Sequence, residues 1–250
     1  MLAPRPRSSR EPLLAVQDVV GAYHVLVAVG EHGRLEPLLA VGCALAAARN
    51  GRVTLLTVTP SGQRPAWLSA GPEIGSSQET GAEETHGVAE LVPPVLEALP
   101  PLCTDVPIEL SVRAGKDVGV EILAAAREVG ADLILLGWRG GRSRGRYLLG
   151  RTLDPVVQYA PCDVAVVRSR TVENDLEAVP RRMERVLVPA GGGPNAALAV
   201  DLALDLSPKV QVTALNVARQ AQGQVALSLS QQRLETILEP WAQETRLQGK

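Results

Sequence analysis

The sequence predicts an α/β protein whose first part is a three-layer sandwich on a parallel five-stranded sheet. Apolar runs of strand length alternate along the chain with Ala- and Leu-rich segments of helical length. The runs are almost continuously apolar, as in "VTLLTV" at 53–58, which is typical of strands covered by helices on both faces. With 46% hydrophobic residues, the 250-residue chain can build the core that this architecture needs.

The expected elements follow one another in regular alternation. Strands are expected at 24–29, 52–58, 108–114, 132–137 and 163–169. Helices are expected at 35–50, 83–99, 118–130 and about 152–159, with a kink or break at the two prolines of the second helix, Pro93 and Pro94. A stretch rich in Gly, Pro and Ser predicts a loop at 60–82.

The pattern begins again near residue 185. There "RVLVPAGGG" parallels "HVLVAVGEH" at 24–32, and "VTALNV" at 212–217 parallels "VTLLTV", at offsets of 161 and 159 residues. Elements that recur in order indicate a tandem duplication. The expected organisation is a tail at 1–22, a domain at 23–169, a charged linker at 170–184 and an incomplete βαβα copy at 185–250.

The second copy is expected to stop after an amphipathic helix at about 225–245, without equivalents of the last three strands of the first copy. Such a half-unit has an exposed apolar sheet edge. This edge must be covered by the first domain or by a partner protein, or the second copy is truncated.

Composition and charge narrow the class of protein. The formal net charge of −2 does not favour a nucleic-acid binder. No apolar run approaches the roughly 18 residues of a membrane span, and the basic N-terminus lacks the apolar region of a secretory signal. The three cysteines, Cys43, Cys103 and Cys162, have no metal-ligand spacing and are interpreted as reduced thiols of a cytoplasmic chain.

The stretch "GRYLLGRT", Gly145 to Thr152, is one lysine short of an ATPase phosphate loop. The first glycine of such a loop directly follows a strand, whereas the predicted strand here ends at Gly137. No apolar strand ends in an aspartate that would hold Mg²⁺. The stretch is therefore not a P-loop, and we expect no ATPase.

A wider glycine spacing points to the end of the fourth strand. Gly137 and Gly140 are separated by two residues, and Gly150 follows after nine more. Open α/β sheets bind ligands at the carboxyl ends of their strands, where glycines let backbone amides approach an oxyanion. Gly150, Arg151 and Thr152 are expected to open a helix, whose free amides favour phosphate.

This G-x2-G-x9-G spacing, flanked by "ADLILLGWRG" and "APCDVAVVR", resembles the universal stress protein family over about 24–168, with a restart at 185. The resemblance implies a parallel five-stranded fold of the adenine-nucleotide α-hydrolase type, dimers or tandem repeats, and ATP binding in some members. In those members Ser or Thr follows the last glycine, but Arg151 stands here and Thr152 comes one place later. The family's adenine-side aspartate falls on Gly30, and its backbone contact to the base falls on Val58.

A second resemblance concerns the paired cytoplasmic stress-protein domains that follow the membrane part of some amino-acid permease-type transporters. It is carried by "GAYHVLVAVGEHGRLEPLLAVGCALA", "LLGWRG" and "LDPVVQYAPCDVAVV". It implies a detached or separately encoded version of such a domain, with a membrane transporter as partner.

An arginine cluster lies beside the glycines. Its members are Arg139, Arg142, Arg144, Arg146 and Arg151. These arginines either close over a polyphosphate, whose oxygens guanidinium groups match, or belong to a solvated loop. Trp138 and Tyr147 interleave with it, a faint signal for RNA stacking that the acidic net charge opposes. We expect no nucleic-acid partner.

Other candidate motifs are better explained by structure than by chemistry. "GGGPN" at 191–195 predicts a glycine turn with Asn195 as helix N-cap. His24, His32 and His86 lack the spacing of a metal triad, and no Ser or Cys lies in a nucleophile elbow. We expect neither an enzyme nor a metal site.

Two functional hypotheses follow from these observations. The first is a non-enzymatic regulatory or sensory domain that binds ATP or another adenine nucleotide through Gly30, Val58, Gly137, Arg139, Gly140, Gly150, Arg151 and Thr152. The alternative is a nucleotide-free interaction module that forms a homodimer through its last strand, Asp163 to Arg168, and regulates a membrane transporter.

Overall fold

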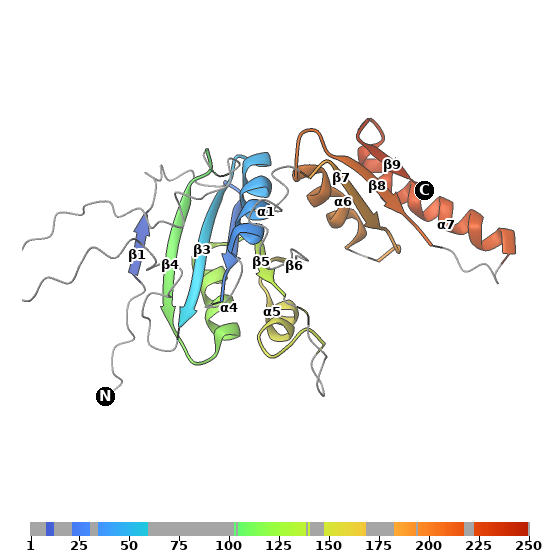
Figure 1. The fold of residues 1–250 in the computed structure, drawn as a ribbon. Helices are drawn as coiled ribbons and strands as arrows, with labels where there is room; N and C mark the ends of the chain where they lie inside the picture. The colour runs from blue at the N-terminus through green and yellow to red at the C-terminus, as the bar shows by residue number, and fades with distance from the viewer. Residues whose placement is uncertain are drawn as a thin grey trace, which may run out of the picture. The chain divides into compact units, whose positions relative to one another are not determined.

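The computed structural model describes residues 9–12, 22–30, 35–59, 103, 105–138, 140, 148–168, 183–193, 195–217 and 223–249. The chain divides into two compact units, unit 1 at Met1–Asn174 and unit 2 at Asp175–Lys250 (Figure 1). The expected helix at 83–99, the loop at 60–82 and most of the linker at 170–184 lie outside the described residues.

Unit 1 contains the predicted five-stranded parallel sheet. Its strands run in the order β4-β3-β2-β5-β6 (Figure 1). Their bounds are β2 His24–Ala28, β3 Arg52–Thr59, β4 Ile108–Ala114, β5 Leu133–Gly137 and β6 Asp163–Val167. All four pairings between them are parallel, as the alternation of strands and helices predicts.

Helices cover both faces of this sheet. On one face α1, Leu35–Ala48, comes so close that a Cβ at Gly42 would lie 2.7 Å from Val27 Cγ2. On the other face α4, Val118–Val129, and α5, Leu153–Tyr159, pack on the alternate side chains of the same strands. The buried cluster on that face comprises Leu26, Leu56, Val58, Ile122, Leu123, Ala125, Ala126, Ala131, Ile134, Leu136 and Val156. The three-layer prediction is confirmed.

The sequence also defines both ends of α4. Asp117 accepts hydrogen bonds from the backbone N–H groups of Gly119 and Val120, at 3.1 and 3.3 Å. These bonds satisfy two of the amides that a helix start leaves free. At the other end Gly130 adopts the left-handed conformation, with φ of 62°, and the chain turns directly into β5.

A sixth strand corrects the expectation of a tail at 1–22. Ser9–Pro12 form β1, which pairs antiparallel with β4 in the register Ser9↔Val112 to Pro12↔Glu109. The outer edge of β4 would otherwise present unpaired backbone groups, and β1 pairs with them. Proline lacks an N–H donor and is tolerated on an edge strand such as this one.

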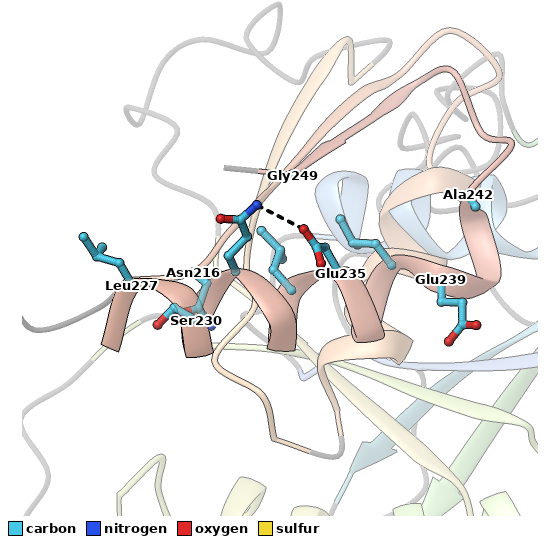
Figure 2. A pocket seen from close by; sticks show the side chains of 10 residues that line it. Asn216, Leu227, Ser230, Glu235, Glu239, Ala242 and Gly249 are labelled. Carbon is cyan, nitrogen blue, oxygen red and sulfur yellow. Dashed lines mark hydrogen bonds between the residues drawn. The ribbon is translucent and has the colours of Figure 1, made fainter. Parts of the chain in front are cut away.

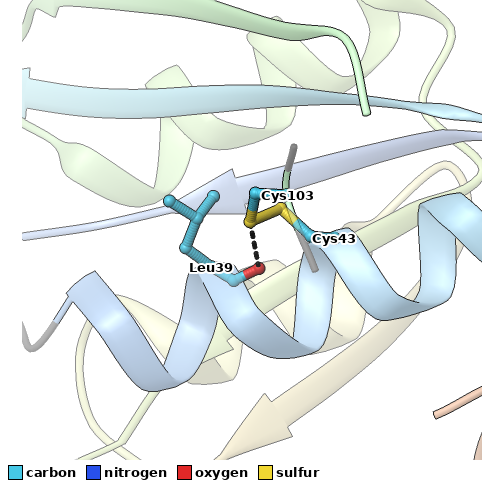
Figure 3. The surroundings of a disulfide bond; sticks show 3 residues. All are labelled: Leu39, Cys43 and Cys103. Carbon is cyan, nitrogen blue, oxygen red and sulfur yellow. Dashed lines mark hydrogen bonds between the residues drawn. A yellow bond between two sulfur atoms is a disulfide. The ribbon is translucent and has the colours of Figure 1, made fainter. Parts of the chain in front are cut away.

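The interpretation of all three cysteines as reduced thiols is wrong for two of them. Cys43 on α1 and Cys103 form a disulfide with a Cα–Cα distance of 5.2 Å (Figure 3). The pair is 60 residues apart in sequence and both side chains are buried. Their proximity arises from the packing of α1 on the sheet, which spacing along the chain does not reveal. Cys162 is the free cysteine.

Unit 2 is a smaller parallel sheet with its helices. Its elements are β7 Arg185–Pro189, α6 Ala196–Asp205, β8 Gln211–Leu215, α7 Gly223–Leu238, the 3-10 turn η4 Glu239–Trp241 and β9 Leu247–Gly249 (Figure 1). The sheet order is β7-β8-β9, with parallel pairing throughout.

The third strand of unit 2 corrects the expected βαβα copy. Strand β9 pairs with β8 as β4 pairs with β3, so the order β7-β8-β9 repeats β2-β3-β4. Three residues are too short a strand to give a periodic sequence signal. Helix α7 accordingly ends at Leu238, earlier than the expected 245.

The glycine turn before α6 is confirmed in part. Gly192 has a φ of 82°, and Asn195 occupies the N-cap position of α6. The Asn195 side chain makes no capping hydrogen bond, so the expected cap is present in position only.

Candidate functional site

The strand order of unit 1 places a topological switch point between β2 and β5. The connection that leaves β2 through α1 returns to β3 on one side, whereas the connection that leaves β5 through α5 returns to β6 on the other side. The two chain paths therefore diverge at the carboxyl ends of β2 and β5. In open α/β sheets the crevice formed in this way is where ligands bind.

The register of the sheet brings predicted residues from neighbouring strands to this end. Ala28 pairs with Leu56 on β3 and with Leu136 on β5, so Gly30 and Val58 lie just past the same level of the sheet. Gly30 is exposed, and a Cβ built on it would meet no atom within 4 Å. The position has room for a side chain that the sequence does not supply.

Val58 serves the core as well as the sheet end. The residue is 9% exposed, and its side chain belongs to the cluster under α4. The side chain is therefore engaged in the core, and the resemblance implies a ligand contact through the backbone instead.

Gly137 and Gly140 lie where β5 ends, and each has its own reason to be glycine. A Cβ at Gly137 would come within 3.0 Å of Leu38 Cδ1 on α1. Gly140 has a φ of 75°, a conformation that other residues rarely adopt. Arg139 and the cluster members Arg142, Arg144 and Arg146 lie outside the described residues, as does Tyr147.

Gly150, Arg151 and Thr152 precede α5, as predicted. Gly150 has a φ of 125°, a Cβ built on it would meet no atom within 4 Å, and Arg151 is exposed. Thr152 occupies the N-cap position, but its hydroxyl makes no capping bond. The backbone therefore leaves this stretch accessible.

Asp154 changes the expectation that α5 would attract phosphate. Its carboxylate accepts hydrogen bonds from the backbone N–H groups of Leu148 and Leu149, at 2.7 and 2.8 Å. A negative charge in the first turn of a seven-residue helix offsets the attraction of the helix dipole for anions. Recognition of an anion at this end must come from the glycine amides and from cationic side chains.

Arg168 is a residue of this region that sequence reasoning did not select. It follows β6 directly, and its guanidinium carbon lies 5.2 Å from the centroid of the Trp138 ring. A Cβ at Gly140 would lie 2.9 Å from both Cζ and Nη2 of Arg168. The sequence signal for Arg168 is its position directly after β6, because ligands of open α/β sheets bind at the carboxyl ends of the strands.

A second arginine near the carboxyl end of the sheet is structural. Arg113 on β4 pairs with Glu121 at 3.6 Å and with Glu128, both on α4. Its side chain is 11% exposed, and its Nε has no partner. The pairings join β4 to α4 and leave little of the charge for a ligand.

His24 and Cys162 are not reactive groups of the site. His24 starts β2, at the opposite end of the sheet, and its Nε2 lies 2.7 Å from Thr54 Oγ1. Burial, reinforced by the negative charges of Asp163 and Asp132, raises the pKa of the Cys162 thiol to about 11, so the thiol is protonated at neutral pH. Within the described ranges, no group of three or more His, Cys, Asp or Glu side chains could hold a metal ion.

Unit 2 carries two hollows of ligand size that are unrelated to the predicted residues. One, of about 610 Å³, is lined by Leu227, Leu234 and Leu238 of α7 together with Asn216 and Gly249 (Figure 2). Part of its polar rim is internally paired, because Gln231 Nε2 donates to Glu235 Oε1 at 3.1 Å and Asn216 Nδ2 donates to Ala190 O at 2.5 Å. The other, of about 600 Å³, lies over β7 and β8. Neither points to a particular ligand.

Comparisons with known proteins agree with the architecture of unit 1. The model of the universal stress protein family matches residues 22–168. A Staphylococcus epidermidis protein named for this family is 40% identical over 63 residues, which is 24% of this chain and 38% of that protein. A Staphylococcus haemolyticus protein of the same name is 31% identical over 70 residues, 28% of this chain and 42% of its own. The aligned regions thus span well under half of these curated relatives.

One solved structure supports the same fold, and a second is similar to part of the chain. A functionally unknown protein of Pseudomonas aeruginosa PAO1 is 14% identical, with a TM-score of 0.52, over 92% of this chain and 73% of its own. A universal stress protein of Archaeoglobus fulgidus, solved in complex with dAMP, is 18% identical with a TM-score of 0.34, over 58% of this chain and 96% of its own. No helix among the described segments has both the length and the apolar character to cross a membrane.

Proposed function

Because the chain belongs to the universal stress protein family, we propose that it is a non-enzymatic regulatory or sensory protein that binds ATP or a related adenine nucleotide. The site is the carboxyl end of β2, β3 and β5 in unit 1. The observation that supports it is the register at the switch point, which sets Gly30, Val58 and Gly137 at the same end of three adjacent strands.

The residues divide into a base side and a phosphate side. The base lies against the backbone of Val58 and beside Gly30. The phosphates meet the backbone of Gly137, Gly140 and Gly150, with Arg139 and Arg151 neutralising charge and Thr152 offering its hydroxyl. Because Gly30 has no side chain to accept a hydrogen bond from the base, the site discriminates weakly between adenine and other bases.

Nucleotide titrations of the whole chain test this proposal. ATP, ADP, AMP and GTP are added with Mg²⁺, and the midpoint of thermal unfolding is followed. A ligand present at 100 times its dissociation constant adds about 2.7 kcal/mol to the free energy of unfolding, so we expect a clear rise. An unchanged midpoint with all four nucleotides at millimolar concentration would falsify the proposal.

A matched pair of glycine variants separates binding from folding. Gly150→Ala and Gly130→Ala both place a side chain at positive φ with no atom nearby, so both strain the backbone without a steric clash. Gly130 follows α4, at the end of the sheet opposite the proposed site. We expect nucleotide affinity to fall only in Gly150→Ala; an equal fall in both variants would point to folding alone.

The second candidate function is a nucleotide-free module that forms a homodimer through β6 and regulates a membrane transporter. The observation in its favour is that β6 is the last strand on its side of the sheet, with Val164 to Val167 only half-buried. Measurement of the molar mass in solution, with Val166→Lys as the disrupting variant, tests the dimer. A monomeric wild-type chain argues against it.

The organisation and location of the chain are part of the same proposal. The repeated order β2-β3-β4 and β7-β8-β9 supports a tandem duplication, with domains at 23–169 and 185–250 joined by 170–184. We place the protein in the cytoplasm on the basis of its family. The Cys43–Cys103 disulfide is unusual for that compartment, and trapping thiols in intact cells determines whether it forms there.

A further inference from the structure

Within the described ranges, the contacts that hold Arg168 against the proposed nucleotide site involve no carboxylate. Its guanidinium carbon lies 5.2 Å from the centroid of the Trp138 ring. The side chain is exposed, and no acidic residue within the described ranges forms an ion pair with it. The positive charge of Arg168 is therefore available to an anion.

The backbone fixes where this charge lies. Strands β5 and β6 pair in the register Gly137↔Val167, and Trp138 N donates to Val167 O at 2.8 Å. Trp138 and Arg168 are consequently neighbours at the carboxyl end of the sheet. The parallel ladder fixes the backbone of the two residues before any ligand arrives, which lowers the conformational entropy lost on binding.

Gly140 provides the space that the guanidinium occupies. Any side chain at position 140 would begin 2.9 Å from Arg168 Cζ and Nη2. Because Gly140 has no side chain, the guanidinium of Arg168 can lie next to the Gly140 backbone, which contacts the phosphates in the proposed function. Guanidinium forks bind phosphate oxygens with two hydrogen bonds, and contact with an aromatic ring leaves N–H groups free to donate.

We propose that Arg168 is a phosphate-binding residue of the nucleotide site and makes the site selective for phosphorylated nucleosides over nucleosides. This inference rests on the proposed function and refines it. Asp154 weakens the attraction of the α5 N-terminus for phosphate, and Arg168 supplies a positive charge in its place. The ligand class is a nucleoside 5′-phosphate, with affinity rising with phosphate charge.

Calorimetric titration of the full chain tests the inference. Wild type, Arg168→Ala, Arg168→Lys and the control Arg185→Ala are titrated with ATP, AMP and adenosine. Arg185 is an exposed arginine at the start of β7 in unit 2. Arg168→Ala should weaken ATP binding on the order of 10- to 100-fold, as loss of a charge-assisted hydrogen bond does, and leave adenosine binding unchanged. Arg168→Lys should fall between, and Arg185→Ala should match wild type.

The possible results are distinct. If wild type binds none of the three ligands, the proposed function is wrong and this inference fails with it. If wild type binds ATP and Arg168→Ala binds it equally well, only this inference fails. If Arg168→Ala binds ATP more tightly, Arg168 obstructs the site instead of completing it, and the inference is overturned.

Fluorescence gives an independent measurement on the same side chains. In a chain with Trp67→Phe and Trp241→Phe, Trp138 is the single tryptophan. Inorganic tripolyphosphate should change the Trp138 emission as Arg168 turns toward the anion, and the change should disappear when Arg168→Ala is added. An unaltered emission, or a change that persists without Arg168, contradicts the inference.

Discussion

Strands β2 and β7 have closely similar sequences, "HVLVA" and "RVLVP", but different surroundings. In β2 the first four residues are buried, whereas in β7 Val188 alone is buried and Leu187 is 59% exposed. Leu26, which corresponds to Leu187, packs under α4 and α5. In unit 2 the described helices pack on the face of Val188. An apolar strand is thus buried on both faces only where the chain supplies helices for both.

The same difference determines where a ligand site can form. In unit 1 the order β3-β2-β5 creates a switch point, with chain connections leaving toward opposite sides. The described strands of unit 2 follow one another in the order β7-β8-β9 and create no switch point. The glycines at 191–193 therefore lie at a strand end without the crevice that Gly137 and Gly140 border.

The largest expected effect concerns the covalent link in unit 1. Cys43→Ser should lower the free energy of unfolding of this unit by about 4 kcal/mol in non-reducing buffer, because a closed loop of 60 residues no longer restricts the unfolded chain. The stability of unit 2 should not change. Urea unfolding of wild type and variant measures the effect.

Reduction provides the control for this prediction. Dithiothreitol should destabilise the wild type and leave Cys43→Ser unchanged. Equal sensitivity of the two proteins to the reductant would show that the disulfide does not stabilise unit 1.

The next effect tests the comparison of β2 with β7 directly. Leu26→Ala should destabilise unit 1 by about 3 kcal/mol, because a fully buried leucine is removed from a packed core. Leu187→Ala, the matched change, should cost less than about 1 kcal/mol because its side chain is 59% exposed. Chemical unfolding followed separately for the two units measures both. Similar losses would indicate that the open face of β7 is covered in solution.

A smaller effect concerns the free thiol of unit 1. With its pKa raised to about 11 by burial and by Asp163 and Asp132, only about one Cys162 thiol in a thousand is ionised at pH 8. Asp163→Asn removes one negative charge and should speed alkylation by iodoacetamide several-fold in the folded protein. The alkylation rates are measured by mass spectrometry. A slower reaction in the variant would contradict the conclusion that Asp163 raises the pKa of Cys162.

The smallest effect concerns the turn before β9 in unit 2. Hydrogen bonds from the side chain and backbone of Arg246 lower the pKa of Glu244 from 4.5 to about 2. Because the pKa is lower in the folded state, the resulting stability is present above pH 4.5 and is lost as the pH falls toward 2. Glu244→Gln should lack this acid-dependent loss of stability in melting scans between pH 6 and pH 2. If the variant and the wild type lose stability identically over this range, Glu244 makes no such contribution.

The sequence predicted the framework of unit 1 because local patterns specify it. Continuous apolar runs marked the five parallel strands, and Asp117 and Gly130 ended α4 where the pattern ended. Features that arise from packing, or that are too short to give a periodic signal, could not be predicted. The Cys43–Cys103 bridge joins residues 60 positions apart, and β9 is too short to leave a periodic signal.

For the candidate site, the glycines were predicted and their partners were not. Gly140 and Gly150 both have a positive φ, a conformation that favours glycine. Asp154, which accepts the Leu148 and Leu149 amides, and Arg168, which lies beside Gly140, depend on how the loops return to the sheet. Contacts made by single side chains leave no repeating pattern in the sequence from which they could be predicted.

Hydrogen–deuterium exchange with and without ATP tests most directly whether the ligand lies at the switch point of unit 1. The account predicts slower exchange in peptides that contain Gly30, Gly137 to Gly140 and Gly150 to Thr152, with no change at 191–193. Protection confined to unit 2, for example around Asn216 and α7, would contradict it.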